Sequence, residues 1–363
     1  MGKALVKVLL VAALLVPLPA WAQEKLTAAD ILNGTELNGF LSAGYNYNFN
    51  TPGDQAIDLR PFNDTHDSFA LELAQLVFHR DAEEPGSAGF RLDLNFGYTV
   101  PAAIHSTGAN SSDDFDIRQA YISYMAPMGK GLKLDFGKFI TDHGAEVIEG
   151  YEGWNWNYSR SFLFYFTIPF THTGLRATYA IDDRIMLSGA IVNGWDNVKD
   201  NNTAKSLHLH AALSVSDEST VNVKYMAGPE QDDDTGNWRH LFNLNLSTAL
   251  GKALVMADIV YGKEEEVPGI GDSTWSGVAG YIRYPLSEKL FLNARAEVFS
   301  DDDGARTGTA QDLWEFTVTP EYIVNDNLVV RAEYRHDSSN KEVFDSGSSK
   351  RQDTVGVNAI FHF

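Results

Sequence analysis

One segment of the sequence, residues 140–169, holds the side chains best suited to a chemical role. Its first part is acidic, with carboxylates at short and similar intervals: Asp142, Glu146, Glu149 and Glu152. Its second part is aromatic: Trp154, Trp156, Phe162, Phe164 and Phe166. A connection of this length is uncommon inside a compact domain unless it is functional. The segment is therefore the first candidate for a site.

Carboxylates act on solutes most strongly when fixed cations face them. Arginines recur in polar–apolar alternating stretches elsewhere in the chain, at Arg91, Arg176, Arg295 and Arg331. A transverse field between such charges orients dipolar solutes and sets ion preference. We therefore predict a constriction in which Asp142, Glu146 and Glu149 lie opposite these arginines. The alternative is that 140–169 packs on the outside, or contacts another subunit through its aromatic side chains.

Other patterns support catalysis or metal binding less well. His208 and His210 share one strand face and are suited to binding a metal together, but no clear third ligand accompanies them. His143, His172 and His336 lie near carboxylates or hydroxyls, which leaves a hydrolase open as an alternative. The chain has no Gly-x-Ser-x-Gly, no His-Glu-x-x-His and no phosphate-binding loop. We predict no catalytic residue, metal or cofactor, and the acidic runs at 232–234, 264–266 and 301–303 are interpreted as solvated loop tips.

Composition excludes several classes of protein. The chain of 363 residues has no cysteine, which excludes disulfides, thiolate metal sites, a cysteine nucleophile and a lipoprotein anchor. A net charge of −21 argues against a nucleic-acid partner, since such partners require basic surfaces. The mean hydropathy of −0.22 is low for helical membrane proteins, but a transmembrane barrel alternates apolar and polar residues and keeps a low average.

The elements that must position these charges are strands. Apolar residues alternate with polar ones along most of the chain, as in 89–98, where Phe90, Leu92 and Leu94 alternate with Arg91 and Asp93. Most of these segments approach the roughly 9–11 residues that a tilted strand needs to cross a bilayer. In 69–80, Glu72 and Gln75 fall on opposite faces, which predicts a bulge or a partly covered face. About sixteen segments follow the pattern: 37–49, 69–80, 89–98, 116–125, 132–139, 170–181, 185–193, 205–215, 221–227, 240–249, 253–261, 274–284, 290–299, 313–323, 328–336 and 354–363.

The connections between these segments alternate strictly between long and short. Short periplasmic turns and long external loops are typical of outer-membrane barrels. The predicted fold is therefore all-β, a transmembrane antiparallel up-and-down barrel of about sixteen strands, wide enough to hold an aqueous channel. As the third long loop, 140–169 has the position of the loop that folds into the lumen of sixteen-strand porins, which is an analogy of fold. The long connections are 50–68, 99–115, 140–169, 194–204, 228–239, 262–273, 300–312 and 337–353.

Both ends of the chain indicate export. Residues 1–22 have the basic, apolar and small-residue regions of a cleaved signal peptide, with cleavage before Gln23. Residues 23–36 are expected to form a short periplasmic segment with a helical turn near Thr27, and 37–363 the barrel. Phe361 and Phe363 alternate with Ile360 and His362 on the last segment and are typical of the signal that outer-membrane barrels present to the insertion machinery. We therefore predict the outer membrane of a Gram-negative-type bacterium.

Two stretches resemble a known family. One runs from Gly137 through Trp154-Asn155-Trp156 to Pro169-Phe170-Thr171-His172-Thr173-Gly174, and the other is Asn193-Gly194-Trp195-Asp196-Asn197. They resemble the OmpL-like family of β-barrel porins, over about 37–363. The resemblance implies a pore-forming outer-membrane protein and supplies neither a substrate nor catalytic residues.

The predicted function is a passive channel for small hydrophilic solutes or ions. A structural or surface-interaction barrel, such as an adhesin or a sleeve for a partner protein, is the main alternative, and an outer-membrane hydrolase is the third. The expected partners are outer-membrane lipid and lipopolysaccharide, the barrel insertion machinery, the solutes and, by analogy with sixteen-strand porins, two further copies in a homotrimer.

Overall fold

The computed structural model describes residues 34–100 and 115–363. The chain divides into two units, Met1–Thr35 and Glu36–Phe363. The predicted signal peptide, its cleavage site and the helical turn near Thr27 lie outside the described residues. Within the described ranges, no helix is long and apolar enough to span a membrane.

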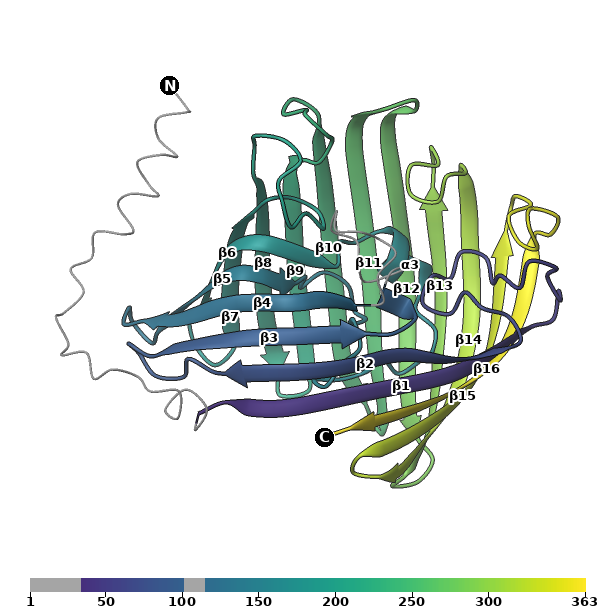
Figure 1. Cartoon of the computed structure of the whole chain (residues 1–363), viewed down its shortest axis with the longest axis horizontal. Coiled ribbons are helices and arrows are strands. Elements are labelled where there is room, and N and C mark those ends of the chain that lie inside the picture. Colours follow the sequence, from purple (N-terminus) through teal and green to yellow (C-terminus); the bar gives the residue numbers. More distant parts are fainter. Residues whose placement is uncertain (1–33, 101–114) are drawn as a thin grey trace. The chain divides into compact units, whose positions relative to one another are not determined.

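The second unit is a closed antiparallel barrel (Figure 1). Each strand pairs with its neighbours in sequence, and β1 pairs with β16 to close the ring. The predicted fold class is confirmed, and so is the number of strands in the described part of the chain. They are β1 (Glu36–Asn48), β2 (Ser68–Arg80), β3 (Ala88–Phe96), β4 (Phe115–Ala126), β5 (Leu132–Ile140), β6 (Thr171–Ala180), β7 (Ile185–Val192), β8 (Ser206–Ser216), β9 (Ser219–Pro229), β10 (Trp238–Leu250), β11 (Ala253–Val267), β12 (Gly271–Pro285), β13 (Leu290–Asp301), β14 (Gln311–Asn325), β15 (Leu328–Ser339) and β16 (Arg351–His362).

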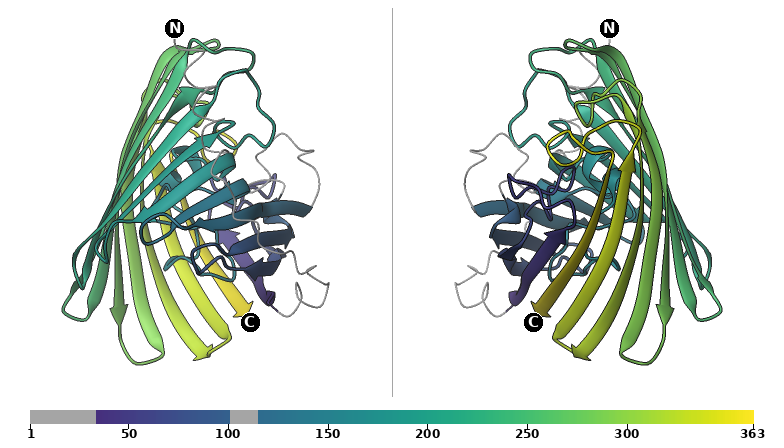
Figure 2. Two further views of the ribbon diagram at one scale, coloured as in Figure 1. Left: turned by 90° about the vertical axis from the view of Figure 1, so that its left-hand side faces the viewer. Right: turned by 90° about the vertical axis from the view of Figure 1, so that its right-hand side faces the viewer.

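Alternation along each strand separates two environments. On β14, Trp314 and Phe316 are exposed on the outside, whereas Glu315 and Thr317 are buried inside. An apolar outer surface suits lipid, and a polar inner surface suits water or a polar filling. The wall differs in length around the ring: β11, β12 and β14 have 15 residues each, but β3 and β5 have 9 and β7 has 8. Figure 2 shows the long strands as a continuous green-to-yellow wall.

The terminal aromatic residue takes part in closing the barrel. The Gly39 amide donates to the Phe363 carbonyl at 2.9 Å, and the Phe363 amide donates to the Gly39 carbonyl at 3.1 Å. A Cβ at Gly39 would lie 2.4 Å from the Phe363 ring, so a larger residue at this position would require the ring to move. Phe361 and Phe363 both face outward and are exposed. Their role as an insertion signal stays a prediction.

The predicted irregularity in the second strand is a bulge at Glu72. Ser42 pairs with Leu73 and the next residue, Ala43, pairs with Leu71, so Glu72 has no counterpart on β1. The extra residue brings Glu72 to the same inner face as Gln75, and both side chains are buried. The bulge thus resolves the conflict in the sequence pattern.

The strict alternation of long and short connections is wrong at one place. The loop predicted at 262–273 is mostly strand, since β11 and β12 leave only 268–270 between them. The strands continue because Arg239 on β10 bonds to Glu264 at 2.8 Å and because the Trp275 ring packs over Gly262. Two acidic residues predicted as solvated are buried: Glu264, and Asp301, which accepts the Thr307 amide at 2.7 Å.

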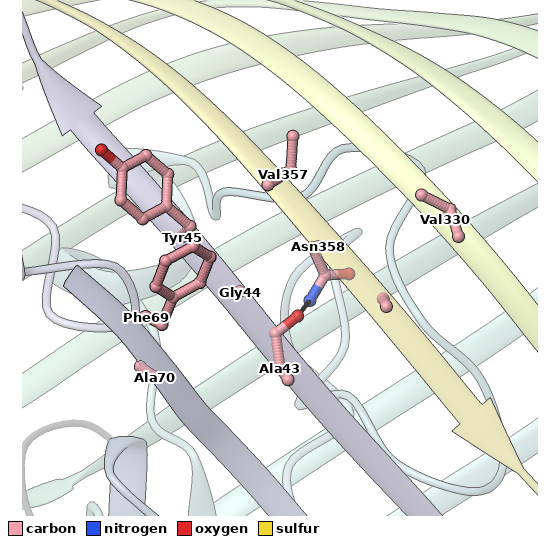
Figure 3. A pocket seen from close by; sticks show the side chains of 9 residues that line it. Ala43, Gly44, Tyr45, Phe69, Ala70, Val330, Val357 and Asn358 are labelled. Carbon is pink, nitrogen blue, oxygen red and sulfur yellow. Dashed lines mark hydrogen bonds between the residues drawn. The ribbon is translucent and has the colours of Figure 1, made fainter. Parts of the chain in front are cut away.

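The outer surface has an apolar hollow of about 250 Å³ where β1, β2, β15 and β16 meet (Figure 3). Small residues such as Ala43 and Gly44 line it, and the rings of Tyr45 and Phe69 lie beside it with centroids 4.8 Å apart. The Asn358 amide donates to the Ala43 carbonyl at 3.2 Å. This hollow belongs to the outward-facing surface and is separate from the charged interior.

Candidate functional site in the loop between β5 and β6

The loop between β5 and β6 crosses the inside of the barrel. Its Gly144 amide donates to the Asn243 side chain on β10 at 2.8 Å. Its Tyr151 amide donates to Gln75 on β2 at 3.0 Å, and its Asn157 side chain donates to Thr319 on β14 at 2.8 Å. These three strands belong to different parts of the wall, so a loop that bonds to all of them must lie between them.

The loop contains one short helix, α3 (Phe162–Phe166), which packs against β12 and β13 (Figure 1). The first amides of a helix have no partners within it. Here Glu297 on β13 accepts the amides of Phe162 at 2.6 Å and Leu163 at 3.1 Å, while the Ser161 hydroxyl accepts the Phe164 amide at 3.0 Å. An acidic side chain of the wall therefore caps the helix and fixes it in place.

The four loop carboxylates reach four different strands. Asp142 Oδ1 lies 3.7 Å from Arg176 Nη1 on β6, and Glu146 Oε1 lies 2.7 Å from Arg295 Nη1 on β13. Glu149 Oε1 lies 3.0 Å from Arg331 Nη1 on β15, and Glu152 pairs with Arg91 on β3. The structure thus places each of the seven predicted site residues in a contact between loop and wall. Glu152, which belongs to the acidic part of the loop but was not predicted at the constriction, pairs with Arg91, and Arg91 also pairs with Asp93 on its own strand at 2.7 Å.

The pair between Glu146 and Arg295 is fully buried. Arg295 also donates to Glu315 at 2.6 Å and to the Ser159 carbonyl at 2.6 Å, and its exposed fraction is 1%. The second carboxylate oxygen of Glu146 accepts the Ser161 amide at 2.8 Å and the Ser161 hydroxyl at 2.7 Å. One arginine therefore joins the acidic and aromatic parts of the loop to the wall.

The second buried centre lies around Glu149. Arg331 contacts one of its oxygens, and Arg160 Nη2 lies 2.9 Å from the other. Burial by itself would raise the pKa of Glu149, but the two guanidinium groups lower it below its ordinary value. Arg331 also donates to the loop carbonyls of Asn155 at 2.8 Å and Asn157 at 3.2 Å. Glu149 is thus held as an anion by both the wall and the loop.

These charges are in direct contact and do not face one another across an aperture. From the sequence we predicted that Glu146 and Glu149 lie opposite arginines, with an electric field between them. At 2.7 and 3.0 Å each pair neutralises itself locally, so the two pairs mainly anchor the loop. Asp142 and Lys133 differ, because their side chains keep 25% and 35% exposure.

Tyr158 of the loop lies in close contact with the wall. The Tyr158 hydroxyl donates to Glu72, the bulged residue of β2, and its amide donates to Glu333 on β15 at 2.6 Å. A Cβ at Gly44 would lie 2.2 Å from the Tyr158 hydroxyl, and one at Gly356 would lie 2.9 Å from its ring. A side chain at either position would therefore require the buried Tyr158 side chain to shift.

The aromatic part of the loop forms apolar clusters inside the barrel. Phe166 stacks on Phe299 of β13 with centroids 6.0 Å apart, and Phe162 and Leu163 pack in the same cluster. Phe164 packs against Phe62 of the first long loop, with centroids 5.7 Å apart. Because these rings are buried inside the barrel, they cannot contact another subunit, which was the alternative considered for the aromatic part of the loop.

The two stretches that carried the family resemblance contact each other at the end of the loop. Asp196 accepts the amides of Phe170 at 2.6 Å and Thr171 at 2.8 Å. Burial raises the pKa of Asp196 to about 6, although these hydrogen bonds oppose the rise. The His172 ring donates to the Gly194 carbonyl at 3.3 Å. Together they hold the loop where it enters β6.

The histidines considered for hydrolysis do not form one site. His143 and His172 are buried in the interior, whereas His336 on β15 pairs with Asp353 on β16 at 2.8 Å, where both side chains are partly exposed. Across 34–100 and 115–363, no group of three or more histidine, aspartate or glutamate side chains is arranged to hold a metal ion.

Comparison with known proteins gives a family and a fold. The family model described as "putative beta-barrel porin-2, OmpL-like" matches residues 34–363. No curated protein matches the chain.

Three solved structures illustrate the fold. An anion-selective porin from Comamonas acidovorans is 10% identical, with a TM-score of 0.63, over 91% of this chain and 99% of that one. The outer membrane channel DcaP of Acinetobacter baumannii is 14% identical, with a TM-score of 0.61, over 91% and 97%. In vitro folded OmpT of Vibrio cholerae, in a trimer form, is 14% identical, with a TM-score of 0.59, over 91% and 99%. At these identities the similarity establishes the fold alone.

Proposed function

The chain belongs to the OmpL-like family of β-barrel porins, and on this premise we propose that it forms a water-filled channel for passive diffusion of small hydrophilic solutes or ions. The observation that carries the proposal is the loop 140–169, bound by its carboxylates to β3, β6, β13 and β15 inside a sixteen-strand barrel. A barrel of this size is wide enough for an aqueous lumen. The loop is then the constriction that limits the size of the solute.

We place the path for solutes along the β3–β6 side of the loop. Arg295 and Arg331 have no side-chain exposure, whereas Lys133, Asp142 and Glu152 keep 35%, 25% and 46%. Groups that remain hydrated are those that a passing solute meets. Because both signs of charge occur among them, we propose weak ion selectivity, set by Asp142 with Arg176 and not by the buried Glu146 and Glu149.

The proposal also includes the location of the barrel in the outer membrane and its assembly into an oligomer. The protein would reach the outer membrane by a cleaved signal peptide and the insertion machinery, and its apolar outer surface would contact lipid and lipopolysaccharide. A homotrimer is proposed by analogy with OmpT of Vibrio cholerae, whose structure is described in a trimer form. The mass of the detergent-solubilised protein tests this, and a monomer under all mild conditions would refute it.

Planar-bilayer recording of the purified full chain tests the channel. We expect stable open-channel steps, and reversal potentials close to zero in a salt gradient because selectivity is weak. Heat-modifiable migration in gel electrophoresis first confirms that the barrel is folded. Folded protein that inserts but gives no steps would refute the channel and favour a structural or surface-interaction barrel.

A further inference from the structure

Three buried histidines meet where the loop 140–169 leaves the wall. His143 belongs to the loop, His172 to β6 and His208 to β8. The ring centroids of His143 and His208 are 4.8 Å apart, and those of His172 and His208 are 5.6 Å apart. Each residue is at most 2% exposed. The cluster therefore joins the loop to two strands of the wall.

Some ring nitrogens of this cluster have no hydrogen-bond partner. Within the described part of the chain, both nitrogens of His143 and Nε2 of His208 are buried without a hydrogen-bond partner. His172 differs, because it bonds to the Gly194 carbonyl at 3.3 Å and the Thr141 hydroxyl at 3.1 Å. Buried polar atoms without partners are costly and call for an explanation.

The groups that face the cluster do not favour an added positive charge. Lys224 on β9 donates to the Gly144 carbonyl at 3.0 Å, next to His143, and Arg176 on β6 lies on the side of His172. The nearest anion, Asp142, is already shared between Arg176 at 3.7 Å and His210 of β8 at 3.5 Å.

A second anion, Asp258 on β11, lies close to the same end of the loop. It accepts the Ala145 amide at 3.1 Å and faces Lys224. Burial, followed by the neighbouring His208 and Lys224, holds the pKa of His143 well below its ordinary value. The docked loop thus requires neutral imidazoles.

We propose that His143, His172 and His208 form a pH-sensitive latch, in which protonation expels His143 together with the loop and widens the lumen. His143 is the member that moves, because the other two are fixed in paired strands. Only the predicted change in conductance rests on the proposed channel function. Displacement of the loop can be measured whether or not the protein conducts.

The direction of the pH effect follows from the linkage between histidine protonation and loop docking. The displaced loop leaves the histidines hydrated, with pKa values near the ordinary value of about 6.5. The docked state is therefore fully favoured above that pH and loses stability as the pH falls below it. Each histidine that is neutral when docked and protonated when displaced shifts the equilibrium about tenfold per pH unit.

The first test compares single-channel conductance between pH 7.5 and 5. In the wild type we expect a larger conductance, or frequent visits to a larger one, below about pH 6.5. H143Q keeps a polar side chain that does not titrate, and its conductance should depend less on pH than that of the wild type, because only His172 and His208 then gain a proton when the loop is displaced. The control is H240Q, since His240 on β10 bonds to Tyr225 and lies outside the cluster. A flat wild-type profile, or an unchanged rise in H143Q, would overturn the latch.

The second test does not depend on conduction. The chain has no cysteine, so I148C provides a single thiol at a loop position that is buried when docked. We expect thiol labelling, corrected with a single cysteine at an exposed turn, to accelerate tenfold or more per pH unit well below pH 6.5. In I148C/H143Q the acceleration per pH unit should be about tenfold smaller, because one titrating histidine has been removed. Equal corrected rates at pH 7.5 and 5 would refute the latch. Acceleration without channel steps would support the latch and refute only the channel.

Discussion

Removing the Arg331 guanidinium should release the loop. The group is fully buried and binds Glu149 at 3.0 Å, two loop carbonyls and Asn358 of β16 at 2.7 Å. Breaking a buried ion pair by removing one partner costs about 3–5 kcal/mol. Because Arg160 still pairs with Glu149 in R331M, we expect the lower end of that range, about 3 kcal/mol. This corresponds to a shift on the order of 10²-fold in the equilibrium between docked and displaced loop.

The assay is single-channel recording of R331M at neutral pH, with labelling of I148C as the measure of docking. We expect larger or noisier currents and faster labelling than in the wild type. R184M, in an exposed turn, is the matched control and should behave as the wild type. Normal currents and labelling in folded R331M would refute the anchoring role of these ion pairs.

Three further predictions follow from other contacts. G44L places a side chain where the Tyr158 hydroxyl lies, so we expect a displaced loop and a larger conductance, with unchanged conductance contradicting the close approach. D142N removes the hydrated anion of the proposed path and should move the reversal potential in a salt gradient toward anions, by more than E146Q moves it; equal shifts would argue against the path. F363A removes the ring that covers Gly39, and its folded fraction should show a lower midpoint of thermal unfolding, whereas an unchanged midpoint would contradict the role of that contact.

The strands were predictable from the alternation of apolar and polar residues. In a pleated strand successive side chains point to opposite faces, so this pattern is set locally. Prediction from this alternation missed the strand extension at Glu264. The charge of Glu264 suggested a loop, but in the structure Arg239 lies beside it and bonds to it, so the strand continues. The bulge at Glu72 was visible as a break in the pattern, because two inward polar residues cannot be three positions apart on a regular strand.

The site was predictable as a set of residues but not as a set of pairs. The acids and arginines could be identified from the length of the loop and the phase of the strands. Their pairing depends on the path of the loop through the interior, which joins Glu146 to Arg295 and Glu149 to Arg331 across much of the chain. The contact of Tyr158 with Gly44 and Gly356 could not be predicted either, since glycine in a strand has many explanations.

The central claim is that the barrel conducts through a lumen narrowed by the loop 140–169. Single-channel conductance of the wild type and of a variant in which a short glycine–serine linker replaces 144–166 tests it most directly. We predict stable steps for the wild type and several-fold larger steps for the variant, with both proteins folded and heat-modifiable. Equal conductance in the two proteins, or no steps in either, would contradict it.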